Sequence, residues 1–265
     1  MPQKYSFSRF IYLDTWVFGK LLKEPKKIRP LFDFLTRHDL CIAVSEALLS
    51  ELSDATHYHP DLNILLTMLP SALIKTSEAI LDEEVRSYPN GRTDTLLLYP
   101  LNIELGRQTI TQWLSSDKLN EARRRQKLDA RKMKQRLDSV KFNFPPSKLG
   151  KYTKEQAKEF AWMITVQWLA STHPDFLRKH KNVKADVFLS IQLHAYYVYY
   201  KYYLDNREPK KLSDFGDLFH LPYLPYCTLA ILERDMSNVL NKIKSHYKVL
   251  DGVAMKNVDF FNGWS

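Results

Sequence analysis

Residues 1–100 alternate short apolar runs with longer stretches in which apolar residues recur at helical spacing. Residues 10–13 (Phe-Ile-Tyr-Leu) are apolar and favour β-structure, which predicts a buried strand that ends at Asp14. A second apolar run at 40–44 predicts another strand, and Ser45 is a suitable cap for a helix over 46–55. The other elements predicted in this part are helices over 15–23, 28–37, 60–69 and 77–87 and a third strand over 72–75.

The chain changes character between about residues 101 and 205, where strand signals disappear and helical ones dominate. The α/β rhythm returns after residue 206. The elements predicted beyond residue 100 are helices over 117–141, 152–171, 185–205, 213–223 and 236–246 and a strand over 228–232. Strands that alternate with helices form open, mostly parallel sheets. We therefore predict an α/β core made of residues 1–100 and 206–265, with residues 101–205 as a large helical insertion.

Composition indicates a folded protein with a polyanionic partner. Hydrophobic residues make up 45% of the 265 positions, which is enough for a core, and the formal net charge is +9. A basic chain favours nucleic acid or an acidic membrane surface. With seven glycines, the sequence has no Gly-x-Gly-x-x-Gly, P-loop or Gly-x-Ser-x-Gly pattern. Dinucleotide-dependent enzymes, P-loop kinases and α/β-hydrolases are therefore poorly supported.

Cys41 and Cys227 are the only cysteines, which gives neither a disulfide framework nor the ligand spacing of a zinc site. Residues 1–9 are polar and lack the apolar core of a signal peptide. No run approaches the roughly 18 apolar residues of a membrane span. We expect no membrane partner and a reducing, cytoplasmic setting.

Acidic residues occur where an open α/β sheet gathers its ligands. Asp14 ends the first predicted strand, and Glu51 lies on the helix after the second. The other candidates flank the last predicted strand and are Asp214 and Asp217 before it and Glu233 and Asp235 after it. Ligand sites in such sheets lie outside the carboxyl ends of parallel strands. We therefore expect these acids to converge in space, although they are far apart in sequence.

A cluster of this kind suits the hydrolysis of phosphodiester bonds. The reaction needs an activated water and stabilised charge on the leaving oxygen, and Mg²⁺ or Mn²⁺ held by carboxylate oxygens supplies both. Crowded carboxylates repel one another unless a cation lies among them. Each acid alone has an ordinary explanation: Asp14 could cap the next helix, Glu51 could be solvated, and the others could lie at a helix N-terminus or on the surface. The prediction depends on the joint pattern.

Two further features bear on nucleic-acid binding. His220 lies three residues after Asp217 on the same helical face, where it could position a phosphate or a water, or be a hydrogen-bonded structural residue. Residues 117–141 hold ten basic and four acidic residues, a net charge of +6, so they form either a phosphate-binding helix or a solvated charged face. The candidate nucleic-acid-binding residues are Arg123, Arg124, Arg125, Lys127, Arg131 and Lys132. The tyrosine-rich run 195–203 could stack on bases, but it is more typical of a core helix.

At these positions the sequence resembles the PIN-domain nucleases of bacterial type. The matching segments are Phe-Ile-Tyr-Leu-Asp-Thr (10–15), Ala-Val-Ser-Glu-Ala-Leu-Leu-Ser-Glu-Leu (43–52), Ser-Asp-Phe-Gly-Asp-Leu-Phe-His-Leu-Pro-Tyr-Leu-Pro-Tyr (213–226) and Leu-Ala-Ile-Leu-Glu-Arg-Asp (229–235). The third segment is the most specific, because it contains Asp-x-x-Asp-x-x-His before Leu-Pro-Tyr and a predicted strand. The resemblance covers about a third of the chain, in two blocks at its ends.

The resemblance implies a three-layer α/β/α PIN-like fold with a mostly parallel sheet, and a divalent-metal endonuclease acting mostly on RNA. By position, Asp14 and Glu51 match the first two acids, and Asp214 or Asp217 matches the third, with Asp217 favoured by its distance to the last predicted strand. The fourth acid normally follows a Thr at the strand end, so either Glu233 or Asp235 takes that role here. The expected ligands of Mg²⁺ or Mn²⁺ are thus Asp14, Asp217, Glu233 and Asp235, and the catalytic set also includes Glu51 and Asp214.

Three functions are compatible with these features. The first is an endoribonuclease with a toxin or defence role, by analogy with stand-alone bacterial relatives. The second is an inactive PIN-like module that binds RNA or protein, because the fourth acid departs from the family pattern. The third is a structure-selective DNA nuclease. Each allows a homo-oligomer, or an inhibitor or other partner protein.

Overall fold

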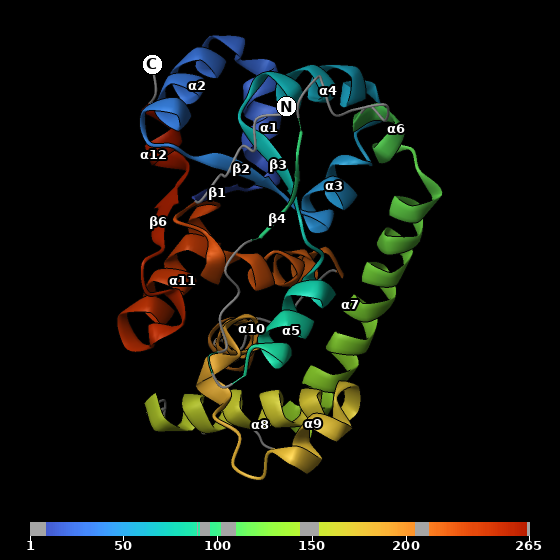
Figure 1. Ribbon diagram of the computed structural model, residues 1–265, viewed down its shortest axis with the longest axis vertical. Coiled ribbons are helices and arrows are strands. Elements are labelled where there is room, and N and C mark those ends of the chain that lie inside the picture. Colours follow the sequence, from blue (N-terminus) through green and yellow to red (C-terminus); the bar gives the residue numbers. More distant parts are fainter. Residues whose placement is uncertain are drawn as a thin grey trace.

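The computed structural model describes residues 9–88, 90, 96–101, 110–143, 154–204 and 212–263. At its centre lies a six-stranded sheet with the strand order β4-β3-β2-β1-β5-β6 (Figure 1). The strands are β1 (Phe10–Leu13), β2 (Cys41–Val44), β3 (Ser71–Ile74), β4 (Leu97–Pro100), β5 (Leu229–Leu232) and β6 (Ala254–Asn257). All neighbouring strands pair in parallel except β3 and β4, which pair antiparallel. The predicted, mostly parallel sheet is therefore confirmed.

Helices occupy most of the remaining described chain. The α-helices are α1 (Thr15–Lys23), α2 (Ile28–Arg37), α3 (Glu46–Leu52), α4 (His59–Met68), α5 (Ser77–Arg86), α6 (Ile110–Leu114), α7 (Asp117–Asn143), α8 (Lys154–Thr172), α9 (Pro174–Lys179), α10 (Leu189–Val198), α11 (Arg234–His246) and α12 (Val258–Asn262). The 3₁₀ turns are η1 (Pro25–Lys27), η2 (Thr56–Tyr58), η3 (Ala185–Val187), η5 (Leu212–Phe219), η6 (Leu221–Tyr226) and η7 (Lys248–Leu250). Element η4 (Tyr199–Tyr203) is a π-helical turn that continues α10.

Helices cover both faces of the sheet, which gives the three-layer α/β/α arrangement predicted above. Alternate residues of each strand point to opposite faces. Ile11 and Leu13 of β1 belong to a core that includes α1, α2 and α4, whereas Tyr12 belongs to a core with α5, α10 and α11. Figure 1 shows these two groups of helices on opposite sides of the strands. Because both faces are buried, the central strands are continuous apolar runs.

The helical middle of the chain packs closely on the second of these cores. α10 lies against α8 and η6, and its Leu193 and Ala195 share a hydrophobic cluster with Tyr12. The long helix α7 runs along the side of the molecule and contacts α3, η4 and η5 (Figure 1). The predicted insertion thus contributes directly to the core beneath the sheet.

Several predicted elements differ in extent from the structure. The predicted helix over 213–223 is the pair of 3₁₀ turns η5 and η6, and in η6 Pro222 and Pro225 lack the backbone N–H that a continued α-helix requires. The predicted helix over 185–205 is divided into η3, α10 and η4. The strands β4 and β6 and the helix α12 were not predicted. Both strands lie at sheet edges; β6 has mixed polarity, and β4 contains Pro100, a residue that argues against a strand in the sequence.

Candidate functional site

The ends of the neighbouring parallel strands β1 and β5 bring two predicted site residues together. Asp14 follows β1, and its backbone N–H donates to the carbonyl of Ile231 at 3.0 Å. Its Oδ2 accepts from the backbone N–H of Glu233, the first residue after β5, at 3.2 Å. Asp14 makes no side-chain capping bond to α1, although it occupies the N-cap position. The backbone N–H of Trp16, in the first turn of α1, nevertheless acts on the Asp14 carboxylate and lowers its pKa, so the capping role considered from the sequence stays open beside the contact with Glu233.

Glu51 reaches the same edge of the sheet from α3. Ser45 caps α3 by accepting from the backbone N–H of Leu48 at 3.1 Å, as predicted. The Glu51 carboxylate accepts a hydrogen bond from the hydroxyl of Thr15, the residue after Asp14, through Oε2. Gly216 of η5 lies beside this carboxylate, since a Cβ at its position would be in van der Waals contact with Oε1 of Glu51, at 3.4 Å.

His220 holds the other oxygen of Glu51 and connects it to the core. Its Nε2 lies 3.0 Å from Oε1 of Glu51, and its Nδ1 lies 2.5 Å from the hydroxyl of Tyr12. The Tyr12 hydroxyl also lies 2.9 Å from Oγ of Ser45. Tyr12 and Ser45 are fully buried and His220 is nearly so. This network fixes Glu51 from both sides, which is a structural role for His220 that the sequence left open.

Asp217 lies beside a lysine that the sequence did not single out. Lys201 of η4 places its Nζ 2.5 Å from Oδ2 of Asp217 and 3.6 Å from Oδ2 of Asp235. The Tyr197 hydroxyl donates to the same Oδ2 of Asp217 at 2.9 Å. The backbone of Asp214 also lies in η5, but its side chain is outside the described residues. Of the two acids in η5, Asp217 is thus the one described at the site.

The charges of these groups act on one another, which locates them in one region. Burial raises the pKa of Asp14, and the charge of Glu51 adds to this, while His220 and the Glu233 N–H act in the opposite direction. Burial and the charges of Asp14 and Asp217 raise the pKa of Glu233. Asp14, Glu51, Asp217 and Glu233 therefore lie in one region, but among the described residues these acids are not grouped as metal ligands, and the predicted acidic site stays a prediction.

Glu51 and His220 form the charge-balanced part of this region. Burial acts to raise the pKa of Glu51, but the hydrogen bond and charge of His220, with the Thr15 hydrogen bond, outweigh it and lower the pKa. Burial acts to lower the pKa of His220, but the hydrogen bond and charge of Glu51 outweigh burial, so the pKa of His220 is raised. The pair is therefore stabilised in its ionic form.

The carboxylate oxygens of the site are suitable ligands for a hard divalent cation, although the described side chains are not arranged as a set of metal ligands. Within the described residues, no group of three or more His, Cys, Asp or Glu side chains is arranged as metal ligands. Carboxylate oxygens are nevertheless the donors that Mg²⁺ and Mn²⁺ prefer. Burial is the main reason that the pKa values of Asp14 and Glu233 are raised, and the charges of His220 for Asp14 and of Lys201 for Glu233 act against it.

The basic helix α7 passes next to this site. It packs on α3 and η5, and the Ser50 hydroxyl donates to Oε1 of Gln126 at 2.7 Å. Arg123 forms an ion pair with Asp54, which follows α3, whereas Arg125 pairs with Glu121 on the same helix. The exposed basic side chains of this helix from the predicted set are Arg124, Arg125, Arg131 and Lys132, and the side chain of Lys127 lies outside the described residues.

The tyrosine-rich run is mainly core, as favoured from the sequence. Tyr196, Tyr197, Tyr199 and Tyr202 are buried. Tyr196 stacks on Tyr247 with ring centroids 3.9 Å apart. The run therefore contributes to the core, and its Tyr197 donates a hydrogen bond to Asp217 at the site. Its buried rings do not form an open surface on which bases could stack.

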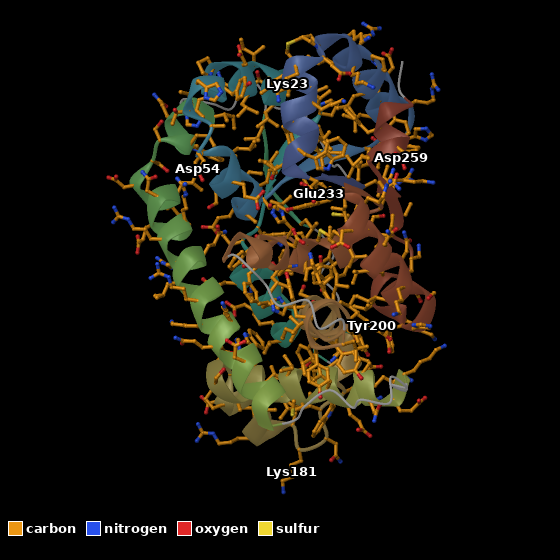
Figure 2. All side chains as sticks on the ribbon, turned by 180° about the vertical axis from the view of Figure 1, so that it is seen from behind. Lys23, Asp54, Lys181, Tyr200, Glu233 and Asp259 are labelled. Carbon is orange, nitrogen blue, oxygen red and sulfur yellow. The ribbon has the colours of Figure 1, made fainter. Side chains whose placement is uncertain are left out.

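Figure 2 shows Glu233 between the N-terminal elements and the helices at the opposite face of the sheet, whereas Lys181 lies at the far end of the molecule.

No described helix is long and apolar enough to cross a membrane. Comparisons of the chain with protein-family models, curated proteins and solved structures gave no match. The resemblance to PIN-domain nucleases therefore stays an interpretation of the residues themselves.

Proposed function

We propose that this protein is a metal-dependent endonuclease that hydrolyses RNA phosphodiester bonds at the edge of the sheet where β1 and β5 end. The observation that carries the proposal is the meeting of Asp14 and Glu233 at the ends of β1 and β5, where Oδ2 of Asp14 accepts from the Glu233 N–H and the charges of Asp14 and Glu51 act on the pKa of Glu233. Carboxylates at the carboxyl ends of parallel strands favour a cation-dependent site.

The chain's own residues would divide the work between them. Asp14 and Glu233, with Asp217 and Asp235 nearby, would hold Mg²⁺ or Mn²⁺, which when bound supplies Lewis acidity and a more acidic water. Both oxygens of Glu51 already accept hydrogen bonds, from Thr15 and from His220. Glu51 therefore acts as a fixed negative charge that orients the site, and His220 keeps it in place.

The substrate class follows from the surface beside the site. Helix α7 contacts the segments that carry Glu51 and Asp217. Its exposed Arg124 and Arg131 would bind phosphates of a strand that enters the site. The net charge of +9 supports a polyanionic substrate. RNA is the expected substrate from the family resemblance, and DNA of matched shape is the alternative to be compared directly.

The test is cleavage of end-labelled single-stranded RNA by the purified chain in Mg²⁺, in Mn²⁺ and in EDTA. We expect metal-dependent internal cleavage by the wild type and its loss in Asp14→Asn. Asp175→Asn is the matched control, because Asp175 is an exposed aspartate on α9 that pairs only locally with Arg178. Equal cleavage by Asp14→Asn and the wild type would exclude this site as the source of activity.

One observation favours a second function, a binding module without catalytic activity. Lys201 and His220 already neutralise Asp217 and Glu51. If cleavage is absent in both metals while RNA binds with a steep dependence on salt, the module is the better description. Competition between RNA and DNA of matched shape in the same assay would identify a DNA-directed protein.

A further inference from the structure

Tyr200 is a member of the tyrosine-rich run that reaches the surface. Its side chain is partly exposed, whereas those of Tyr199 and Tyr202 are buried. It precedes Lys201 in η4, and consecutive residues of a helical turn point in different directions. Lys201 faces Asp217, and Tyr200 instead faces α11. The turn η4 therefore joins the acidic region to a second group of side chains.

This second group, the Tyr200 cluster, consists of Tyr200, Lys242, His246, Tyr247 and Lys154. Nζ of Lys242 lies over the Tyr200 ring, 4.9 Å from its centroid. The His246 ring, four residues further along α11, is inclined by 26° to that of Tyr200, with centroids 6.4 Å apart. The Tyr200 hydroxyl lies 2.9 Å from that of Tyr247, which donates to the carbonyl of Lys154 at 3.4 Å. The cluster thus draws on η4, α11 and the first residue of α8.

The cluster carries positive charge beside a ring. Lys154 and Lys242 are exposed, and among the described residues neither forms an ion pair with a carboxylate. Burial and the charges of these two lysines lower the pKa of His246, which favours its neutral form. Its Nδ1 is shielded from solvent and has no hydrogen-bond partner in the part of the chain that the structure describes. An aromatic ring with two unpaired cations suits a ligand that has a planar group and a negative charge, as a nucleotide does.

Helix α11 connects the Tyr200 cluster with the acidic site. It begins at Arg234, directly after Glu233, and Lys242 follows eight residues later, about 12 Å along the helix axis. In Figure 2, Tyr200 lies below Glu233 along the course of this helix. A strand bound at the end of β5 would therefore reach the cluster within a few nucleotides.

We propose that the Tyr200 cluster is a binding site for one nucleotide of a single-stranded RNA, a few nucleotides away from the phosphate at the acidic site. The base stacks on the Tyr200 ring, and the exposed Lys242 exchanges its contact with this ring for an adjacent phosphate. Cation–π contacts of exposed lysines are weak, so this exchange costs little. The distance to the cut rests on the proposed function, whereas the binding of RNA by the cluster does not.

The first test compares RNA affinities of the full chain by fluorescence anisotropy in EDTA, with labelled decauridine as the probe. We expect Tyr200→Ala to weaken binding about 10-fold, as for the loss of one stacked base. Tyr200→Phe keeps the ring and loses only the hydroxyl bonded to Tyr247, so it should bind like the wild type. Lys242→Met should lower the slope of log affinity against log salt by about 0.7.

Tyr88→Ala is the matched control for the loss of the ring. Tyr88 is also partly exposed, its hydroxyl is also hydrogen-bonded, and its ring centroid lies 4.9 Å from that of a histidine, His180. This change should leave the RNA affinity unaltered. Equal losses in Tyr88→Ala and Tyr200→Ala would contradict a specific contact at Tyr200.

A second measurement identifies the contact directly. Decauridine with 5-iodouridine at a single position is crosslinked to the wild type by light, and mass spectrometry should find the crosslink on Tyr200. Competition with unlabelled uridine monophosphate and with decathymidylate distinguishes the ligands. Protection of Tyr200 by the free nucleotide at the concentration at which decauridine protects it would overturn the strand as the ligand, and tighter binding of the DNA would overturn RNA.

Folding and binding are kept separate in this design. Urea unfolding accompanies each variant, and Tyr200→Leu, which keeps apolar bulk without an aromatic ring, replaces Tyr200→Ala if the alanine variant does not fold. Wild-type affinity in a folded variant without the ring, or crosslinks only at other residues, would overturn the proposal. If RNA binds through Tyr200 but is not cleaved in Mg²⁺ or Mn²⁺, the proposed nuclease fails and the binding site remains.

Discussion

The backbone N–H of Glu233 donates to Oδ2 of Asp14 at 3.2 Å, although 219 positions separate the two residues in sequence. The contact exists because β1 and β5 are parallel neighbours in the sheet, with Leu13 opposite Ile231. Each strand therefore delivers an acid to the same edge. The site depends on this register, since a shift by one residue would turn the side chains to the other face.

Asp14→Asn should separate activity from stability. We expect cleavage to fall by about 100-fold or more, because loss of a group that only supports a metal ligand already costs about 10–100-fold. The folded pKa of Asp14 is raised, so ionised Asp14 costs stability as the pH rises through that value, and the neutral amide removes the cost. Thermal unfolding in EDTA at pH 7.5 should therefore show a Tm equal to or above that of the wild type. A large fall in Tm would mean that the lost activity reflects misfolding.

Tyr12→Phe should weaken the network that holds Glu51. Its hydroxyl lies 2.5 Å from Nδ1 of His220 and 2.9 Å from Oγ of Ser45 in the core, so its removal deprives the buried Nδ1 of this hydrogen bond and leaves Ser45 with its contact to the Leu48 N–H. We expect a loss of about 1–3 kcal/mol in the free energy of unfolding, measured with urea, and reduced cleavage.

Tyr88→Phe is the control for this change. The Tyr88 hydroxyl also has two partners, the carbonyl of Asn182 at 3.4 Å and the N–H of Lys184 at 3.1 Å, but it is partly exposed. Water can replace these bonds, so stability should change little. Equal losses in Tyr12→Phe and Tyr88→Phe would contradict the role given to the Tyr12 network.

Glu84 should make stability depend on pH. This fully buried carboxyl accepts from the Tyr226 hydroxyl and from the Ser190 N–H, while the described residues offer no partner to its Oε2. Burial raises its pKa from 4.5 to about 7, and these hydrogen bonds only partly oppose the shift. Because the folded pKa is the higher one, its contribution to stability is complete below pH 4.5 and is lost as the pH rises to about 7.

Glu84→Gln should remove this dependence. We expect similar unfolding free energies for variant and wild type near pH 4.5, and an advantage of the variant that approaches roughly 3 kcal/mol above pH 7. Glu78→Gln, an exposed change on the same helix, should leave the pH slope unaltered. Urea unfolding across this range measures the slope, and parallel curves for wild type and Glu84→Gln would refute the argument.

Replacing Arg124 and Arg131 together by alanine should weaken RNA binding without altering the acidic site. Both side chains are exposed on α7. Each lost phosphate contact should lower the slope of log affinity against log salt by about 0.7 for single strands. Lys181→Ala, a change at the far end of the molecule, is the control (Figure 2). Fluorescence anisotropy at several salt concentrations, in EDTA, makes the comparison, and an unchanged slope would show that α7 does not contact the RNA.

The sequence by itself determined the local elements of the core and the positions of the acids along them. Continuous apolar runs identified β1, β2 and β5, because strands buried on both faces need apolar residues throughout. The sequence also predicted Ser45 as the N-cap of α3, because a cap accepts a hydrogen bond from a residue close to it in sequence. Asp14 and Glu233 followed as residues at strand ends.

Only the tertiary structure decided which of these groups meet. The contacts of Lys201 with Asp217 and Asp235, and of Tyr12 with His220, join segments whose proximity depends on how α10, η4 and η5 pack beneath the sheet. A tyrosine-rich run gives no local sign that one lysine within it faces two acids. Hydrophobic periodicity specifies which face of an element is buried, whereas the partner across the interface is chosen by packing of the whole chain.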